Sequence, residues 1–127
     1  MQPRADAAVA FEPGRVCVVM TADCLPVVFA DRAGTRIGVA HAGWRGLVGG
    51  VLEATVAALQ AEPDQLVAWL GPAIGPDAFE VGSEVRDAFI ARDAANADAF
   101  VRNATGRYQA DLYRLARRAL ARVGVHQ

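Results

Sequence analysis

The sequence predicts an α+β fold in which a β-hairpin and amphipathic helices share one hydrophobic core. Two short apolar runs separated by a turn indicate the hairpin, and apolar residues recurring at spacings of three and four indicate the helices. The length of 127 residues, with 54% hydrophobic and 21% charged residues, suits one globular domain. We therefore expect residues 1–127 to form a single domain, with helices flanking a mixed sheet.

The first part of the chain predicts three strands. A β-branched apolar run indicates a strand over Arg15–Thr21. Leu25–Asp31 and Thr35–Ala40 are separated by a short turn and are expected to pair antiparallel. Pro26 cannot donate a ladder hydrogen bond, so it belongs at the first residues of its strand or on a sheet edge.

The rest of the chain alternates helices and strands. Apolar residues at helical spacing predict one helix from about residue 46 to 62 and another over 109–123. Ser83 and Glu84 are typical of a helix start, and Asp93–Ala104 is expected to be a loop or a short helix. Between these lie a predicted buried strand over 66–70, a loop rich in glycine and proline over 71–76, and a short strand over 79–81.

Composition and charge favour a cytoplasmic protein without nucleic-acid or membrane partners. The thirteen basic residues are all arginines, scattered along a chain with a net charge of −1, so no basic patch for nucleic acid is expected. No apolar run reaches the roughly 18 residues needed to cross a bilayer, and the polar start is unlike a secretion signal. Cys17 and Cys24 are therefore expected to stay reduced, with Cys17 packed in the core.

Cys24 and His41 are the residues most suited to chemistry. A thiolate and an imidazole serve together as metal ligands, or as nucleophile and base, and both uses require them to be close in space. If the predicted hairpin forms, Cys24 just before its first strand and His41 just after its second strand lie side by side at its open end. The alternative is that Cys24 is a small buried hydrophobe and His41 a hydrogen-bonded turn residue.

Arg45 and Trp44, which follow His41, are further candidates for the site. Arg45, at the start of the following helix, either holds a phosphate or is an exposed capping residue. Trp44 is interpreted as lining a pocket and Trp69 as part of the core. A catalytic zinc site usually has three protein ligands, and His126 near the chain end is expected to be solvated or in a strand rather than the third ligand.

Four motifs in order, TADCLPVVF, AHAGWRG, WLGPAIGP and FEVGSEV, resemble the YfiH family, also called laccase-domain or peptidoglycan editing factor proteins. The resemblance implies a four-layer α/β/β/α sandwich related to the toxin-type cysteine deamidases. It also implies a zinc ion held by His, Cys and His, with Cys24 as the cysteine and His41 as the last histidine. Copper is less expected, because a multicopper site needs many histidines and this chain has two.

The family resemblance implies a purine nucleoside phosphorylase. Its substrates would be adenosine, inosine or methylthioadenosine with phosphate, adenosine deamination would be a side activity, and Cys24, His41 and Arg45 would be the catalytic residues. The family's first histidine, in a Gln-Val-His-Gly type motif, has no counterpart here, so we expect the central part of a longer domain. Two alternatives remain: a metal-free Cys–His hydrolase acting on peptidoglycan precursors, and an inactive fragment or binding module. The oligomeric state is not specified by the sequence.

Overall fold

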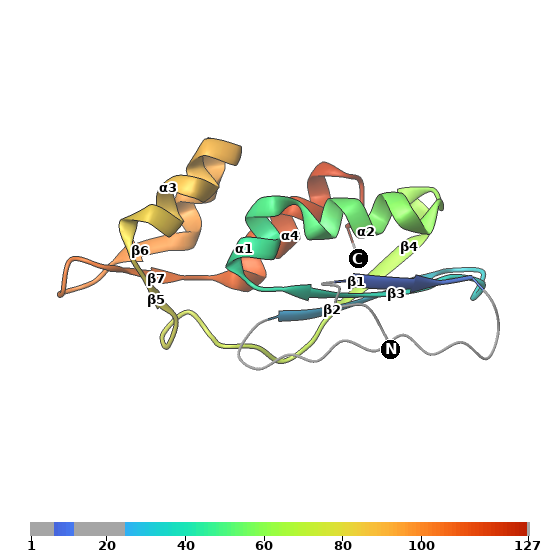
Figure 1. The fold of residues 1–127 in the computed structure, drawn as a ribbon, viewed down its shortest axis with the longest axis horizontal. Coiled ribbons are helices and arrows are strands. Elements are labelled where there is room, and N and C mark those ends of the chain that lie inside the picture. Colours follow the sequence, from blue (N-terminus) through green and yellow to red (C-terminus); the bar gives the residue numbers. More distant parts are fainter. Residues whose placement is uncertain (1–6, 12–24, 127) are drawn as a thin grey trace, which may run out of the picture.

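In the computed structural model, which describes residues 7–11 and 25–126, helices cover one face of two antiparallel sheets that lie end to end (Figure 1). The larger sheet has the strand order β1-β3-β2-β4. Its strands are β1 (Ala7–Ala10), β2 (Leu25–Asp31), β3 (Ile37–Ala42) and β4 (Leu66–Leu70). The predicted strand over Arg15–Thr21, together with Cys17 and Cys24, lies outside the described residues.

The predicted hairpin is confirmed, but its second strand begins two residues later than expected. The Asp31 carboxylate accepts hydrogen bonds from the Thr35 hydroxyl at 2.6 Å and from the backbone N–H groups of Thr35 and Arg36 at 2.7 and 2.9 Å. These bonds hold both residues in the turn, so β3 starts only at Ile37. The hydrogen bond from the Thr35 side chain, followed by that from the Arg36 backbone, lowers the pKa of Asp31 from 3.8 to about 2.

The larger sheet has one face covered by helices and one open face. Strand residues alternate between the faces, and those of β2 on the helix side, Leu25, Val27 and Phe29, are fully buried. The same alternation places Val67 and Trp69 of β4 on the open face, where Trp69 is 60% exposed. The expectation that Trp69 belongs to the core is therefore wrong. Strand β4 is not the buried strand expected, since only its helix-side residues pack inward.

Two helices replace the single helix expected from residue 46 to 62. Helix α1 (Trp44–Gly49) and helix α2 (Val51–Leu59) are separated by Gly50, whose φ of 92° is left-handed. A left-handed residue ends a right-handed helix, and glycine adopts this conformation without a Cβ clash. The apolar stripe continues across the break, so the periodicity alone indicated one helix. A 3-10 helix, η1 (Pro63–Gln65), then leads into β4.

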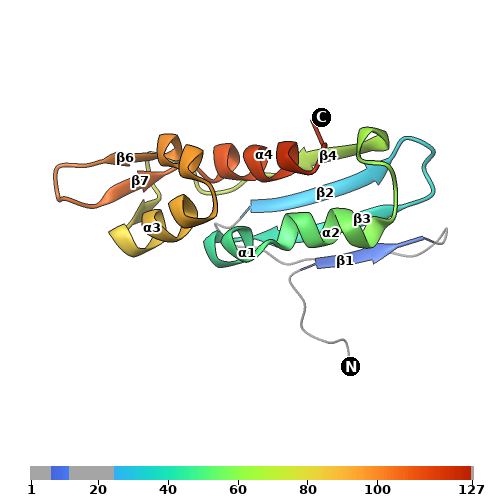
Figure 2. The same ribbon diagram turned by 90° about the horizontal axis from the view of Figure 1, so that it is seen from above.

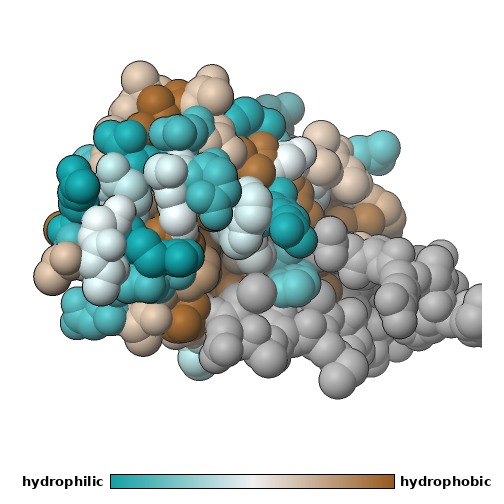
Figure 3. Space-filling model, turned by 60° about the vertical axis from the view of Figure 1, so that its left-hand side comes forward, coloured by the Kyte–Doolittle hydropathy of each residue, from teal (hydrophilic) through white to brown (hydrophobic). Residues whose placement is uncertain are grey.

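The second sheet is small and has the strand order β5-β7-β6, with β5 (Glu80–Val81), β6 (Phe100–Arg102) and β7 (Tyr108–Ala110). Helix α3 (Ser83–Arg92) starts after the N-cap Gly82, without the side-chain cap expected from Ser83. The segment expected to be a loop or short helix contains both the 3-10 helix η2 (Ala94–Ala99) and strand β6. Figure 3 shows this end of the molecule, where hydrophilic side chains surround smaller hydrophobic patches.

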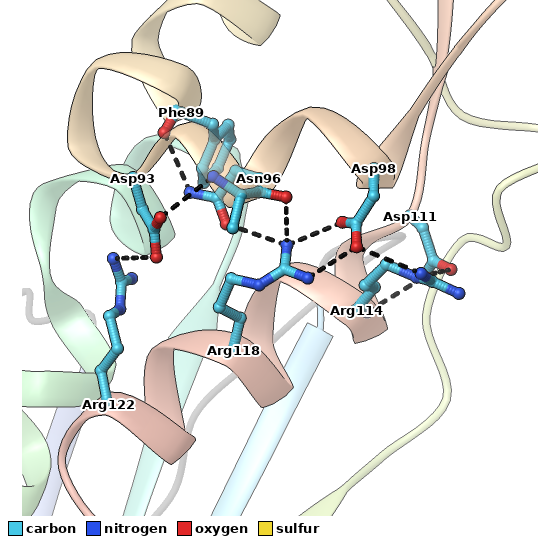
Figure 4. A network of polar contacts seen from close by, with 9 residues as sticks. Phe89, Asp93, Asn96, Asp98, Asp111, Arg114, Arg118 and Arg122 are labelled. Carbon is cyan, nitrogen blue, oxygen red and sulfur yellow. Dashed lines mark hydrogen bonds and ion pairs between the residues drawn. The ribbon is translucent and has the colours of Figure 1, made fainter.

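The last helix, α4 (Leu112–Arg122), begins later than expected because residues 108–110 form strand β7. The Asp111 side chain caps the helix by accepting from the backbone N–H of Arg114 at 3.1 Å. Arg118 donates to both oxygens of Asp98 at 2.7 Å and to the carbonyl oxygen of Ala95 at 2.9 Å (Figure 4). These contacts attach α4 to η2, and the Arg118 hydrogen bond lowers the pKa of Asp98.

The described elements form two layers rather than four. Seen from above, α2 lies over the larger sheet, α1 lies near one end of that sheet, and α4 lies beside α1 and α2 (Figure 2). Their apolar residues form one buried cluster with the sheet and with α3. Every strand pair among residues 7–11 and 25–126 is antiparallel, so the mixed sheet expected from the sequence is not seen in this part of the chain.

Candidate active site

His41 lies near the end of β3, directly opposite Pro26 of β2. Opposed residues of an antiparallel pair point to the same face, so the half-buried His41 side chain is on the open face with Pro26. The sequence predicted His41 just after the strand, and the structure instead places it within β3. Cys24 lies outside the described residues, so its predicted proximity to His41 stays a prediction.

Pro26 sits at the second residue of an interior strand. The expectation that it begins its strand is confirmed, and the alternative of a sheet edge is wrong. Pro26 has no backbone N–H to donate, but its carbonyl oxygen accepts a hydrogen bond from the backbone N–H of Gly71 at 2.8 Å. Gly71 directly follows β4 and continues its pairing with β2, so His41, Pro26 and Gly71 form one row across three strands. We call these three residues the His41 row.

Gly71 allows an unusually close approach within this row. A Cβ built on Gly71 would lie 2.7 Å from Cγ of Pro26 and 3.1 Å from the Trp69 ring. Contacts below 3.0 Å are not tolerated by real side chains, so the position requires glycine for steric reasons. Where the chain leaves β4, the backbone of Gly71 is therefore in close contact with the Pro26 ring.

The segment of residues 71–77, which we call the Gly-Pro loop, is held at both ends by side chains from the last third of the chain. The Tyr113 hydroxyl of α4 donates to the carbonyl oxygen of Gly71 at 3.0 Å and accepts from the N–H of Ala73 at 2.9 Å. Gln109 of β7 donates from its amide nitrogen to the carbonyl oxygens of Pro76 and Asp77 at 3.0 and 3.1 Å. The loop could be predicted from the sequence, but Tyr113 and Gln109 could not, because no local pattern connects them to it.

Arg45 lies at the exposed start of α1, four residues after His41. Its guanidinium group lies over the Trp44 ring, 5.1 Å from the ring centroid, which keeps the charge at the surface and orients it. A Cβ on Gly46 would lie 3.2 Å from the His41 carbonyl oxygen, so the helix also packs closely against the end of β3. The AHAGWRG motif therefore brings His41 and Arg45 to the same end of the sheet.

The described residues do not contain a complete metal site. Among residues 7–11 and 25–126, no group of three or more His, Cys, Asp or Glu side chains is arranged to hold a metal ion. His126 is exposed, in agreement with its prediction as a solvated residue. A three-ligand zinc site built on His41 therefore requires donors from outside the described residues, and Cys24 is the predicted one.

A cavity of about 250 Å³ lies on the helix side of the larger sheet, between β4 and the end of α4. It is lined by Ala68, Leu70, Arg117, Leu120, Ala121, Val125 and His126. Because Ala68 and Leu70 point away from the open face, the cavity is separated from the His41 row by the sheet. No helix in the described part of the chain is both long and apolar enough to cross a membrane.

Comparison with known families shows which family the chain belongs to. The model of a family described as multi-copper polyphenol oxidoreductase laccase matches residues 1–127. The chain belongs to this laccase-domain family. The resemblance that the four sequence motifs indicated is thereby confirmed, and it extends over the whole chain.

The laccase-domain chain is similar in sequence to two curated relatives and in structure to one crystal structure. It is 60% identical over 124 residues to the purine nucleoside phosphorylase YfiH of Escherichia coli, which covers 98% of this chain and 51% of the relative. It is 42% identical over 124 residues to the adenosine deaminase RL5 of an unknown prokaryotic organism, covering 94% and 47%. A crystal structure of a Neisseria meningitidis protein matches with a TM-score of 0.92 and 56% identity, covering 96% of this chain and 50% of that one. The chain spans about half the length of the curated relatives it matches.

Proposed function

We propose that the protein carries out phosphorolysis of purine nucleosides, with adenosine deamination as a second activity. The observation that carries the proposal is the 60% identity to a protein named purine nucleoside phosphorylase, over 98% of this chain. The similarity to a protein named adenosine deaminase supports the second activity. Both would use the same site, at the end of the larger sheet near which His41 and Arg45 lie.

Zinc is the metal proposed for this site. The half-buried imidazole of His41 is fixed on a strand, and Cys24, one residue before β2, would supply the second donor. A bound zinc ion polarises a substrate oxygen or lowers the pKa of a bound water.

Arg45 is proposed to bind phosphate. A guanidinium group matches a phosphate with two parallel hydrogen bonds and stays charged at neutral pH. The Arg45 guanidinium group stacks on the Trp44 ring, 5.1 Å from the ring centroid, which orients the group without burying its charge. Trp44 would then orient Arg45 as well as line the site.

The proposal includes the four-layer fold, and the exposed apolar side chains on the open face of the larger sheet support it. These side chains include Ile37 and Val67, each 37% exposed, and Trp69 at 60%. A second sheet packed on this face would remove these side chains from water, with helices on the outside of both sheets. The two described layers would be one half of that sandwich.

The proposal is tested by measuring zinc content and nucleoside cleavage on the same protein samples. We expect stoichiometric zinc, phosphate-dependent release of the purine base, and loss of both in Cys24→Ala and His41→Ala. The loss of activity should be about a hundredfold or more, since even supporting residues of metal sites cost 10 to 100-fold. Cys17→Ala and His126→Ala remove the other cysteine and histidine and should retain both properties.

Two results would replace the proposal. A zinc-free protein that hydrolyses its substrate and loses activity in Cys24→Ala would be a Cys–His hydrolase, with Cys24 as nucleophile and His41 as base. A folded protein without zinc and without turnover would be a binding module or an inactive fragment.

A further inference from the structure

We propose that the Gly-Pro loop forms one wall of the nucleoside site and that Tyr113 is the residue that positions it. The inference rests on the proposed function, because it assigns the loop to the substrate of that reaction. It adds a positioning residue on α4, outside the four motifs that identify the family.

The start of the Gly-Pro loop lies in the same row of the sheet as His41. His41, Pro26 and Gly71 occupy one row on neighbouring strands, and neighbouring strands lie about 5 Å apart. Gly71 is therefore roughly 10 Å from His41 across the row, a span comparable with the length of a nucleoside. A substrate whose reacting end is at His41 would reach the start of the loop with its other end.

The Gly-Pro loop depends on other parts of the chain for its position. It contains two prolines, which donate no backbone hydrogen bonds, and after Gly71, whose N–H donates to Pro26 of β2, its residues pair with neither sheet. Two hydrogen bonds to the Tyr113 hydroxyl, at 2.9 and 3.0 Å, link Gly71 and Ala73 to α4. The loop therefore takes its position from the helix layer, whose apolar residues are packed in the core.

The contact between Tyr113 and the loop depends on one atom, the hydroxyl oxygen. Tyr113 donates and accepts through the same hydroxyl oxygen, so Tyr113→Phe removes both bonds while keeping the ring. Tyr108→Phe is the matched control, since it removes the same atom from a tyrosine of the second sheet and keeps the ring that lies under Arg86.

The experiment measures amide hydrogen exchange and steady-state kinetics for wild type and both variants. In Tyr113→Phe we expect the Ala73 amide to exchange about tenfold faster, because a hydrogen bond worth about 1.4 kcal/mol has been removed. The KM for the purine nucleoside should rise about tenfold while the KM for phosphate stays unchanged, a split that general destabilisation would not produce. Tyr108→Phe should behave as wild type in both measurements.

Four results would overturn the inference. Unchanged exchange at Ala73 would show that Tyr113 does not hold the loop, and faster exchange with unchanged nucleoside KM would show that the loop is not part of the site. A wild-type protein that cleaves no nucleoside refutes the proposed function and the substrate contact together, while Ala73 exchange still decides whether Tyr113 holds the loop. If Tyr113→Phe does not fold, Gln109→Met loosens the other end of the loop, and unchanged nucleoside KM in that variant overturns the inference.

Discussion

Gly71 meets the ring of Pro26 so closely that a Cβ on Gly71 would lie 2.7 Å from the proline Cγ. This contact is made where β4 ends and the Gly-Pro loop begins, in the row that contains His41. The close approach explains why the loop starts with glycine, and it leads to the first of four predictions about stability.

Gly71→Ala should destabilise the fold. The added methyl group would overpack the contact with Pro26, at an expected cost of about 1 to 3 kcal/mol in the free energy of unfolding. Gly75→Ala, in the same loop, has no heavy atom within 4 Å of the added Cβ and should change stability by less than about 1 kcal/mol. Urea unfolding of both variants tests this, and equal stabilities would contradict the proposed steric role of Gly71.

The two glycines between α1 and α2 should respond to alanine with opposite signs. Gly50 has a φ of 92°, so Gly50→Ala should cost about 1 kcal/mol or more. Gly49 is helical and has open space at its Cβ position, so Gly49→Ala should stabilise by up to about 1 kcal/mol. Thermal unfolding monitored by circular dichroism distinguishes the two, and a stabilising Gly50→Ala would mean that the helix break is not enforced at this residue.

Asp31 should make the fold sensitive to acid. Its pKa is lowered from 3.8 to about 2 in the folded protein, mainly by the hydrogen bond from the Thr35 hydroxyl. The folded state therefore binds a proton less readily than the unfolded state, so the contribution of Asp31 is complete above pH 3.8 and is lost as the pH falls toward 2.

Asp31→Asn provides the comparison for this pH dependence. The variant should be less stable than wild type at neutral pH, and the difference should shrink as the pH falls from 3.8 to about 2. The measurement is the free energy of unfolding at a series of pH values. A difference that stays constant through this range would show that the Asp31 carboxylate does not titrate as described.

Arg118 should contribute more to stability than its neighbour on the helix. It donates to both oxygens of Asp98 and to the Ala95 carbonyl oxygen, with only 22% of its side chain exposed. Arg118→Gln should cost about 1 to 2 kcal/mol, because several charge-assisted hydrogen bonds are lost at a partly buried position. The exposed Arg117 is the control, and Arg117→Gln should stay within about 0.5 kcal/mol of wild type in the same urea titrations.

Local patterns accounted for the elements whose residues interact with near neighbours. The bounds of β2 and β4 agree with the sequence prediction, since each is a short apolar run delimited by turn residues. The single long helix was wrong because periodicity counts apolar residues and does not register one left-handed residue at Gly50. Strand β6 was missed because three residues are too few for an alternation to be recognised, and its pairing partner β7 lies across a turn.

The same distinction applies to the site. The sequence by itself determined the family, the hairpin that carries His41, and the glycine and proline content of the loop, because these are written in contiguous residues. Only the tertiary structure decided that His41 faces the open side of the sheet, that Trp69 is exposed, and that Tyr113 and Gln109 hold the loop. The face of a side chain depends on strand register, and the partners of the loop depend on helix packing. The hydrogen bonds from Tyr113 and Gln109 join residues 32 to 42 positions apart, which leaves no pattern in either segment alone.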